Sequence, residues 1–132
     1  MKKVHNILYL INNNLIKRLT EIPPTTEVVG FLSENFMTFG TAIDALKNGL
    51  IVRRKEWNET KFVIKQIPAH INEDIIPNMQ SLPSMAKKLI LNGKGFIDYQ
   101  NQCLIYNEIN GTADSWFPTM ADIFAEDWEV VS

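Results

Sequence analysis

The sequence predicts a small α+β domain with an antiparallel sheet and short helices, preceded by a helical N-terminal appendage. The chain has 132 residues, of which 45% are apolar. That is enough for one core and too few residues for two ordinary domains. From residue 37 onward, short β-prone segments alternate with short helical ones, as is typical of α+β folds. The pair Asn110-Gly111 is a strong hairpin signal because both residues tolerate positive φ.

The N-terminal segment predicts one amphipathic helix. Apolar residues recur at steps of three and four over residues 4–22, and Pro23 and Pro24 end the pattern. We therefore separate an appendage, residues 1–36, from a ligand-binding α+β domain, residues 37–132. The appendage is either a docking arm or a helix that covers the core, and the second interpretation is favoured.

The domain itself is predicted as short elements separated by turns. The predicted strands are rich in β-branched and aromatic residues and cover residues 50–54, 61–67, 96–99, 103–106 and 128–131. The predicted helices cover residues 42–46, 85–91 and 120–125. For the first helix, Thr38 or Thr41 is available as the N-cap and Gly49 as the C′ residue. Residues 69–84 are predicted as a loop. Residues 96–99 and 103–106 are predicted as neighbours joined by a polar turn, and residues 128–131 as an edge strand.

The charge balance argues against a nucleic acid polymer as partner. The chain carries 13 basic and 15 acidic residues, for a net charge of -2, whereas proteins that hold duplex nucleic acid need a basic face. A small anionic ligand remains compatible, because one or two Arg or Lys side chains can hold it.

Localisation and redox state follow from two further features. Cys103 is the one cysteine, so no internal disulfide forms, which fits a reducing compartment. The apolar run at the N-terminus stops at three asparagines, residues 12–14, and no stretch approaches the ~20 apolar residues that span a bilayer. We expect a cytoplasmic protein without membrane contact.

No catalytic or metal-binding set is recognisable. The histidines His5 and His70 have no ligand partners at metal-binding spacing. No glycine-rich phosphate loop or nucleophile elbow occurs, and Cys103 lies among apolar strand residues, where a buried thiol is expected. The sequence therefore predicts a binding protein without cofactor or metal, not an enzyme.

Two aromatic and polar clusters are the candidate binding residues. Arg54, Trp57 and Asn58 stand at the end of a predicted strand, where Trp offers a stacking surface, Arg binds a phosphate and Asn contacts a base edge or ribose hydroxyl. Trp116 and Asp122 flank a predicted helix N-terminus that suits an anion. On these residues alone, Trp57 and Trp116 are equally compatible with core anchors. Trp128 is assigned to the core.

Three stretches resemble a family of small phage and prophage proteins that includes the second type of Thoeris anti-defence protein. They are residues 37–49 (Met-Thr-Phe-Gly-Thr-Ala-Ile-Asp-Ala-Leu-Lys-Asn-Gly), residues 52–58 (Val-Arg-Arg-Lys-Glu-Trp-Asn) and residues 116–128 (Trp-Phe-Pro-Thr-Met-Ala-Asp-Ile-Phe-Ala-Glu-Asp-Trp). The resemblance covers residues 37–132. Residues 70–95 form a longer stretch here than in compact members.

The resemblance implies a sponge for immune signals that holds a cyclic ADP-ribose-type or other cyclic nucleotide intact. It also implies a homo-oligomer, a dimer of dimers. By motif, Trp57 would stack on the base with Asn58 and Arg54 nearby, and Phe39 would form a second aromatic wall. The rest of the pocket, contributed in some arrangements by a neighbouring subunit, would be lined by Trp116, Thr119 and Asp122.

Two other functions remain open at this stage. One is a non-enzymatic module that binds a host or phage protein through the N-terminal helix and the tryptophans. The other is an enzyme that degrades a cyclic nucleotide, in which case the ligand would be consumed instead of being recovered intact.

Overall fold

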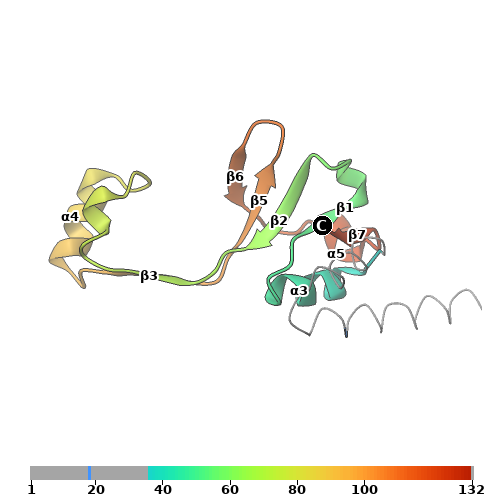
Figure 1. Cartoon of the computed structure of the whole chain (residues 1–132), viewed down its shortest axis with the longest axis horizontal. Helices are drawn as coiled ribbons and strands as arrows, with labels where there is room; N and C mark the ends of the chain where they lie inside the picture. The colour runs from blue at the N-terminus through green and yellow to red at the C-terminus, as the bar shows by residue number, and fades with distance from the viewer. Residues whose placement is uncertain (1–17, 19–35, 132) are drawn as a thin grey trace, which may run out of the picture. The chain divides into compact units, whose positions relative to one another are not determined.

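The computed structural model describes residue 18 and residues 36–131 (Figure 1). Apart from Arg18, the predicted N-terminal helix over residues 4–22 therefore lies outside the described residues. The chain divides into two compact units. The first contains the described residues up to Lys65 and from Gln102 onward, and the second is Gln66–Asn101. Antiparallel sheets with short helices confirm the predicted α+β class.

The first unit is built on a five-stranded antiparallel sheet in the order β6-β5-β2-β1-β7. Its strands are β1 (Val52–Arg54), β2 (Lys61–Lys65), β5 (Cys103–Asn107), β6 (Thr112–Ser115) and β7 (Trp128–Val130). The predicted hairpin is confirmed, because β5 pairs with β6 and Gly111 in their connection has φ 73°. As predicted, β7 is an edge strand.

Helix α3 (Phe39–Lys47) packs against β1, β2 and β7 (Figure 1). Thr38 is its N-cap, and the Thr38 hydroxyl accepts from the backbone N–H of Thr41 at 3.4 Å. Gly49 follows the C-cap with φ 83°, which a Cβ-bearing residue rarely adopts. The helix is thus confirmed with its predicted caps, and it begins three residues earlier than its apolar pattern indicates.

The core of the first unit is organised around Trp128, which is fully buried together with Met37, Val52, Val63 and Val130. Met37 and Trp128 exchange two backbone hydrogen bonds, at 2.6 and 3.2 Å. The indole Nε1 of Trp128 donates to the carbonyl oxygen of Asp122 at 2.9 Å, so this buried polar atom is satisfied. The assignment of Trp128 to the core is confirmed.

The second unit contains a two-stranded antiparallel ribbon of β3 (Ala69–Ile71) and β4 (Ile97–Tyr99). Between these strands run a 3-10 helix, η2 (Ile76–Asn78), and helix α4 (Ser84–Asn92). Ile76 is fully buried, whereas α4 has no buried residue. The helix predicted over residues 85–91 is confirmed.

Two sequence predictions for this region are wrong. Residues 69–84 are not a plain loop, because they contain β3 and η2; Pro77 stands in the first turn of η2, where its fixed φ is compatible with a helix. Residues 96–99 and 103–106 are not paired with each other. Instead, β4 pairs with β3, and β5 pairs with β2 and β6.

Among the described residues, no helix is long and apolar enough to cross a membrane.

Candidate functional site

Three of the aromatic residues predicted to bind a ligand meet around Trp128. The ring centroids of Phe39, Trp57 and Trp116 lie 6.0, 5.4 and 5.8 Å from that of Trp128. The two tryptophans approach it edge to face, at interplanar angles of 82° and 78°, a favoured aromatic geometry. All three partners are half-buried. They are therefore anchored in the core through Trp128 and are partly reachable by solvent.

Trp57 is positioned by a tight turn between β1 and β2. It ends a 3-10 helix, η1 (Lys55–Trp57), and Asn58 follows in the left-handed region with φ 50°. Asparagine adopts this conformation more readily than most residues do. The Thr60 hydroxyl donates to the carbonyl oxygen of Trp57 at 2.6 Å and fixes the turn. Asn58 itself is exposed and directly follows Trp57 in the chain.

Lys61 is a candidate residue that the sequence interpretation missed. Its Nζ lies 5.2 Å from the centroid of the Trp57 ring, within cation–π distance. In the sequence, Lys61 could have been found from its position four residues after Trp57, at the start of a predicted strand that is observed as β2. A positive charge thus stands against the aromatic surface proposed for a base.

Arg54 is the centre of an ion-pair cluster. Its Nε donates to Asp127 Oδ1 at 2.9 Å, and its Nη1 lies 3.1 Å from Asp122 Oδ1 and 2.7 Å from Glu56 Oε2. The Arg54 side chain is only 12% exposed. One cation therefore faces three carboxylates, which gives the cluster a formal excess of negative charge.

The electrostatics of this cluster favour the charged forms. Burial opposes the charge of Arg54, but hydrogen bonds to Asp127 and Asp122 raise its pKa above the ordinary value. Burial likewise opposes ionisation of Asp127, but hydrogen bonds from Arg54 and from the Glu56 backbone N–H hold the pKa of Asp127 below its usual range. Arg54 and Asp127 form a hydrogen-bonded ion pair that joins β1 to the start of β7.

Thr119 and Asp122 form the capping box of helix α5 (Met120–Phe124). The Thr119 hydroxyl accepts from the Asp122 backbone N–H at 3.1 Å, and the Thr119 N–H donates to Asp122 Oδ2 at 2.9 Å. Asp122 is buried, and its other carboxylate oxygen contacts Arg54. Both residues thus have structural partners that fix the N-terminus of α5; the ligand role that the family resemblance implies for them stays a prediction.

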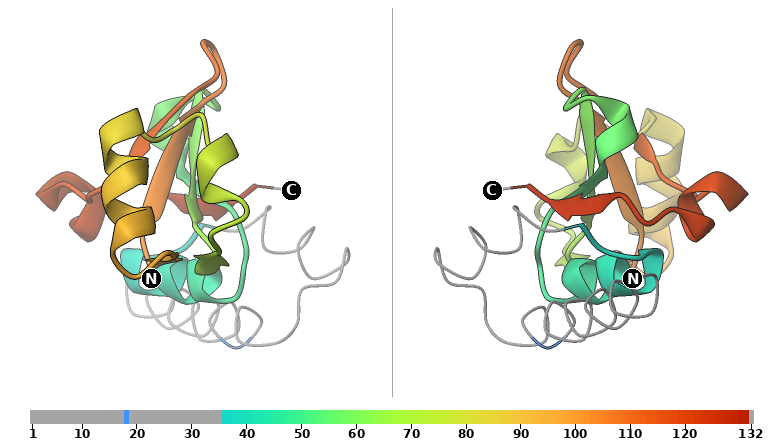
Figure 2. Two further views of the ribbon diagram at one scale, coloured as in Figure 1. Left: turned by 90° about the vertical axis from the view of Figure 1, so that its left-hand side faces the viewer. Right: turned by 90° about the vertical axis from the view of Figure 1, so that its right-hand side faces the viewer.

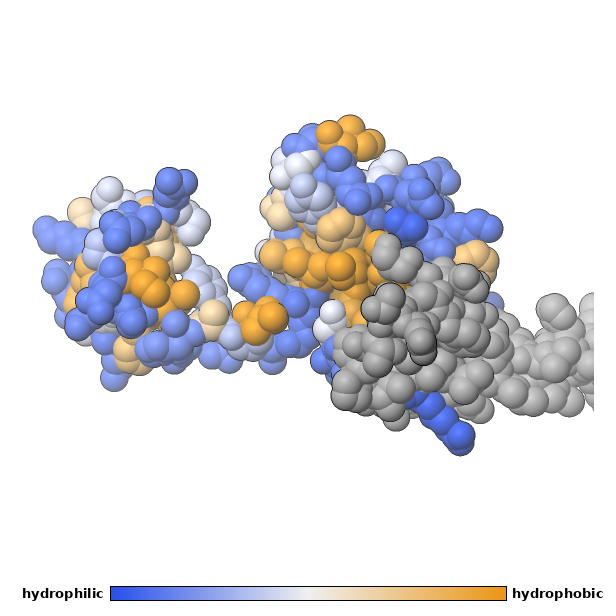
Figure 3. All heavy atoms as spheres, in the orientation of Figure 1, coloured by the Kyte–Doolittle hydropathy of each residue, from blue (hydrophilic) through white to orange (hydrophobic). Residues whose placement is uncertain are grey.

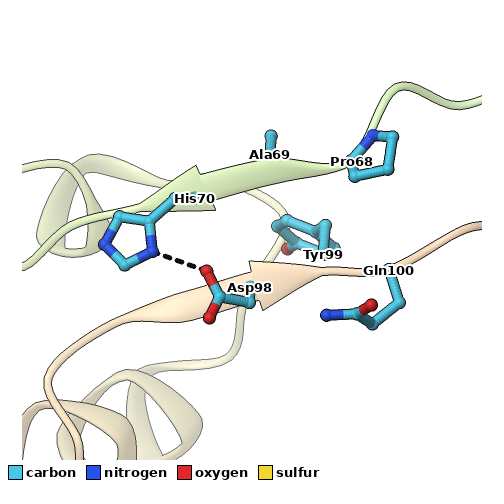
Figure 4. Close-up of a pocket in the computed structure, with 6 residues that line it drawn as sticks. All are labelled: Pro68, Ala69, His70, Asp98, Tyr99 and Gln100. Carbon is cyan, nitrogen blue, oxygen red and sulfur yellow. Dashed lines mark hydrogen bonds and ion pairs between the residues drawn. The ribbon is translucent and has the colours of Figure 1, made fainter.

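A separate pocket lies on the ribbon of the second unit (Figure 4). The His70 Nδ1 and Asp98 Oδ1 atoms are 2.5 Å apart across β3 and β4. They border a pocket of ≈ 200 Å³ whose other lining residues are Pro68, Ala69, Tyr99 and Gln100. The sequence placed His70 in a loop; the structure corrects this, because His70 belongs to β3. Both members of the pair are more than half exposed.

Comparison with known proteins identifies the family. A sequence model of the Thoeris anti-defense 2-like domain matches residues 37–131. The chain is also 32% identical over 101 residues to the protein named Thoeris anti-defense 2 of Bacillus phage SP01, covering 73% of this chain and 96% of that relative. The family match includes the aromatic cluster around Trp128. The chain therefore belongs to the Thoeris anti-defense 2-like family of anti-defence proteins.

Proposed function

We propose that this protein counters Thoeris defence by binding a cyclic ADP-ribose-type or other cyclic nucleotide signal and sequestering it without degradation. One observation carries the proposal: in a chain of the Thoeris anti-defense 2-like family, Phe39, Trp57 and Trp116 converge around one buried ring. Half-buried aromatic rings that are held in place by the core are suited to stacking on a base, because little side-chain entropy is lost on binding. The signal molecule would then not reach the bacterial effector.

The charges near Trp57 suggest which residues would contact the phosphate groups of the ligand and which would hold the site in place. Arg54 is committed to Asp122, Asp127 and Glu56, so the surrounding cluster repels a phosphate more than it attracts one. We therefore assign Arg54 to positioning η1 and α5. Phosphate groups would instead meet Lys61, whose ammonium already lies beside Trp57. Asn58, exposed next to Trp57, remains available for a base edge or ribose hydroxyl.

The remaining pocket wall would come from Trp116, Thr119 and Asp122. Because Asp122 is buried and engaged, its contribution would be to orient α5, while Thr119 and Trp116 keep accessible surface. We propose that the protein acts as a homo-oligomer, so that this wall can face a nucleotide held by a neighbouring copy. The site of action would be the host cytoplasm.

The absence of hydrolysis is part of the proposal. Burial raises the pKa of the Cys103 thiol above its ordinary value, with Lys65 acting weakly in the opposite direction. A thiol with a raised pKa is a poor nucleophile, because the thiolate is the reactive form. We therefore do not expect Cys103 to attack a bound nucleotide.

The aromatic site is tested by replacing Trp57 with leucine. Trp57→Leu keeps an apolar contact with Trp128 but removes the stacking surface, which contributes ~1–3 kcal/mol per base. We expect the affinity for cyclic ADP-ribose isomers, measured by isothermal titration calorimetry, to fall by about 5- to 150-fold.

Tyr99→Leu is the matched control, since Tyr99 lines the pocket of the second unit. It should leave the affinity unchanged. Circular dichroism establishes that both variants are folded. Unchanged affinity in Trp57→Leu together with loss in Tyr99→Leu would move the ligand to the ribbon pocket and contradict the proposed site.

A further inference from the structure

The sheet of the first unit carries large apolar side chains on both of its faces. Val63 and its cross-strand partner Ile105 pack in the core. Side chains alternate between the two faces along a strand, so the residues on either side of this pair point away from the core. They form two further cross-strand pairs of β2 and β5, which are Phe62 with Tyr106 and Ile64 with Leu104. We call these four residues the outer apolar face.

Both α-helices of the first unit lie on the core side of the sheet. The α3 residues Ala42, Ala45 and Leu46 belong to the core cluster, and Asp122 of α5 accepts a hydrogen bond from buried Trp128. In both views of Figure 2 the β5–β6 hairpin extends away from α3. A sheet with apolar side chains on both faces is stable when both faces are covered. Among the described residues of this unit, the outer apolar face lacks a helix that covers it.

The outer apolar face is partly exposed to solvent. Each of its four side chains is half-buried, because they cover one another in part; the rings of Phe62 and Tyr106 lie 5.2 Å apart. Figure 3 shows apolar side chains at the surface of this unit. Arg53 and Glu129 point to the same side of the sheet and pair with each other at 2.9 Å. Their charges are thus balanced, and this side of the sheet favours an apolar occupant.

The N-terminal appendage contains an apolar surface that matches the outer apolar face. The apolar stripe of the helix predicted over residues 4–22 consists of Val4, Ile7, Leu8, Ile11, Leu15, Leu19 and Ile22. Arg18, the described residue of this segment, is helical. A helix of this length is about 28 Å long, and five strands about 4.8 Å apart are ~20 Å across. The stripe is therefore long enough to cross the sheet.

The point at which the appendage enters the first unit allows this contact. Met37 exchanges backbone hydrogen bonds with Trp128, so the chain enters beside β7, at one edge of the sheet. Residues 23–36 connect the predicted helix to that point and can span up to about 45 Å, more than the width of the sheet. A tethered segment acts at an effective concentration in the millimolar range. A second copy or a host protein would have to displace it.

We propose that residues 4–22 form an amphipathic helix that packs its apolar stripe on the outer apolar face of the same molecule. The appendage would then be a covering layer of the domain instead of an arm that binds a host or phage protein. This inference does not depend on nucleotide capture, because the outer apolar face and the aromatic cluster around Trp128 lie on opposite faces of the sheet.

Two neighbouring positions of β6 make a matched pair for testing this contact. Ser115 pairs with Leu104 and so points to the outer side, whereas Asp114 pairs with Ile105 and points to the core side. Both Ser115 and Asp114 are exposed. A cysteine at either position can therefore be reached by a reagent without disturbing the core, and the two cysteines would differ in the face of the sheet that they report.

The test is cross-linking in the full-length chain with Cys103→Ser as background. Asn12→Cys places a thiol at the flank of the apolar stripe, and a short bis-maleimide joins it to Ser115→Cys or, as the control, to Asp114→Cys. We expect about tenfold more cross-link within one chain for the Ser115→Cys pair than for the Asp114→Cys pair, because the helix is held on the outer side. Mass spectrometry distinguishes cross-links within a chain from those between chains. Circular dichroism establishes that the variants are folded.

Two outcomes would overturn the proposal. Equal yields for the Ser115→Cys and Asp114→Cys pairs would show that the appendage does not prefer the outer side. Cross-links that join two chains only would show that the appendage covers another copy.

A second measurement reports the covering of the face itself. Leu8→Asp places a charge in the apolar stripe and should increase the fluorescence of the dye 8-anilinonaphthalene-1-sulfonate several-fold, because the outer apolar face becomes accessible. Asn13→Asp adds the same charge on the polar side of the predicted helix and should leave the fluorescence unchanged. The same fluorescence in both variants would contradict the proposal. Both measurements are made without nucleotide, so a protein that captures no nucleotide refutes the sponge and leaves this contact intact.

Discussion

At the scale of single residues, the role expected of Arg54 changes once the carboxylates around it are known. In the sequence it stands three residues before Trp57 and is available for a phosphate. In the structure it contacts Asp122 and Asp127, which are 68 and 73 residues away along the chain. No local pattern predicts such contacts, because they depend on how β1, α5 and β7 come together. Lys61 is different, because it follows Trp57 by only four residues; its place over the Trp57 ring depends on the turn between β1 and β2.

The lowered pKa of Asp127 leads to a prediction of how the free energy of unfolding depends on pH. Its pKa is lowered in the folded protein relative to the ordinary value of 3.8. A carboxyl with a lowered folded-state pKa stabilises the protein above its unfolded-state pKa, and this contribution is lost as the pH falls through the folded-state value. We therefore expect the free energy of unfolding, measured by urea denaturation, to decrease as the pH is lowered below about 4.

Asp127→Asn removes the titrating group from this cluster. The variant should be less stable than the wild type at pH 7, because Arg54 loses a charged partner. It should also lose less additional stability between pH 5 and pH 2. An identical acid dependence in the two proteins would show that Asp127 does not contribute as described.

At the scale of secondary-structure elements, the sequence predicted the helix caps and the hairpin turn, because residues close together in the chain determine them. Helix α3 has its N-cap at Thr38 and a left-handed glycine at Gly49, and the β5–β6 hairpin has its turn at Asn110 and Gly111. All of these are encoded within a few residues. The pairing partner of β4 is not encoded locally, because a three-residue strand carries no information about which of several strands it will pair with. Its pairing with β3, across α4, is a long-range contact.

The capping box of α5 predicts a measurable loss of stability. Thr119→Ala removes the hydroxyl that accepts from the Asp122 N–H, and loss of an N-cap side chain costs ~1 kcal/mol. We expect this decrease in the free energy of unfolding by urea denaturation. Thr119→Ser keeps the hydroxyl and should remain close to the wild type. Equal stability of the alanine variant and the wild type would show that the cap does not stabilise α5.

At the scale of the whole molecule, the family match and the two units have different extents. The match runs from residue 37 to residue 131 and so spans both units. The aromatic cluster and the ion pairs of Arg54 lie in the first unit, whereas the ribbon pocket and α4 lie in the second. The family resemblance marked residues 70–95 as longer than in compact members, but the sequence did not reveal a second compact unit. The reason is that η2 and α4 are short and that this unit has little buried apolar surface to show in the sequence. Among the described residues of Gln66–Asn101, Ile76 is the one fully buried side chain.

The central claim, that the protein captures a nucleotide signal intact, is tested most directly by recovering the ligand. The purified chain is incubated with a panel of cyclic ADP-ribose isomers and cyclic oligonucleotides, unbound ligand is removed, and the protein is denatured by heat. Mass spectrometry then identifies what is released. We predict release of one intact cyclic nucleotide. Recovery of a cleaved product, or of no nucleotide from folded protein, would contradict the account.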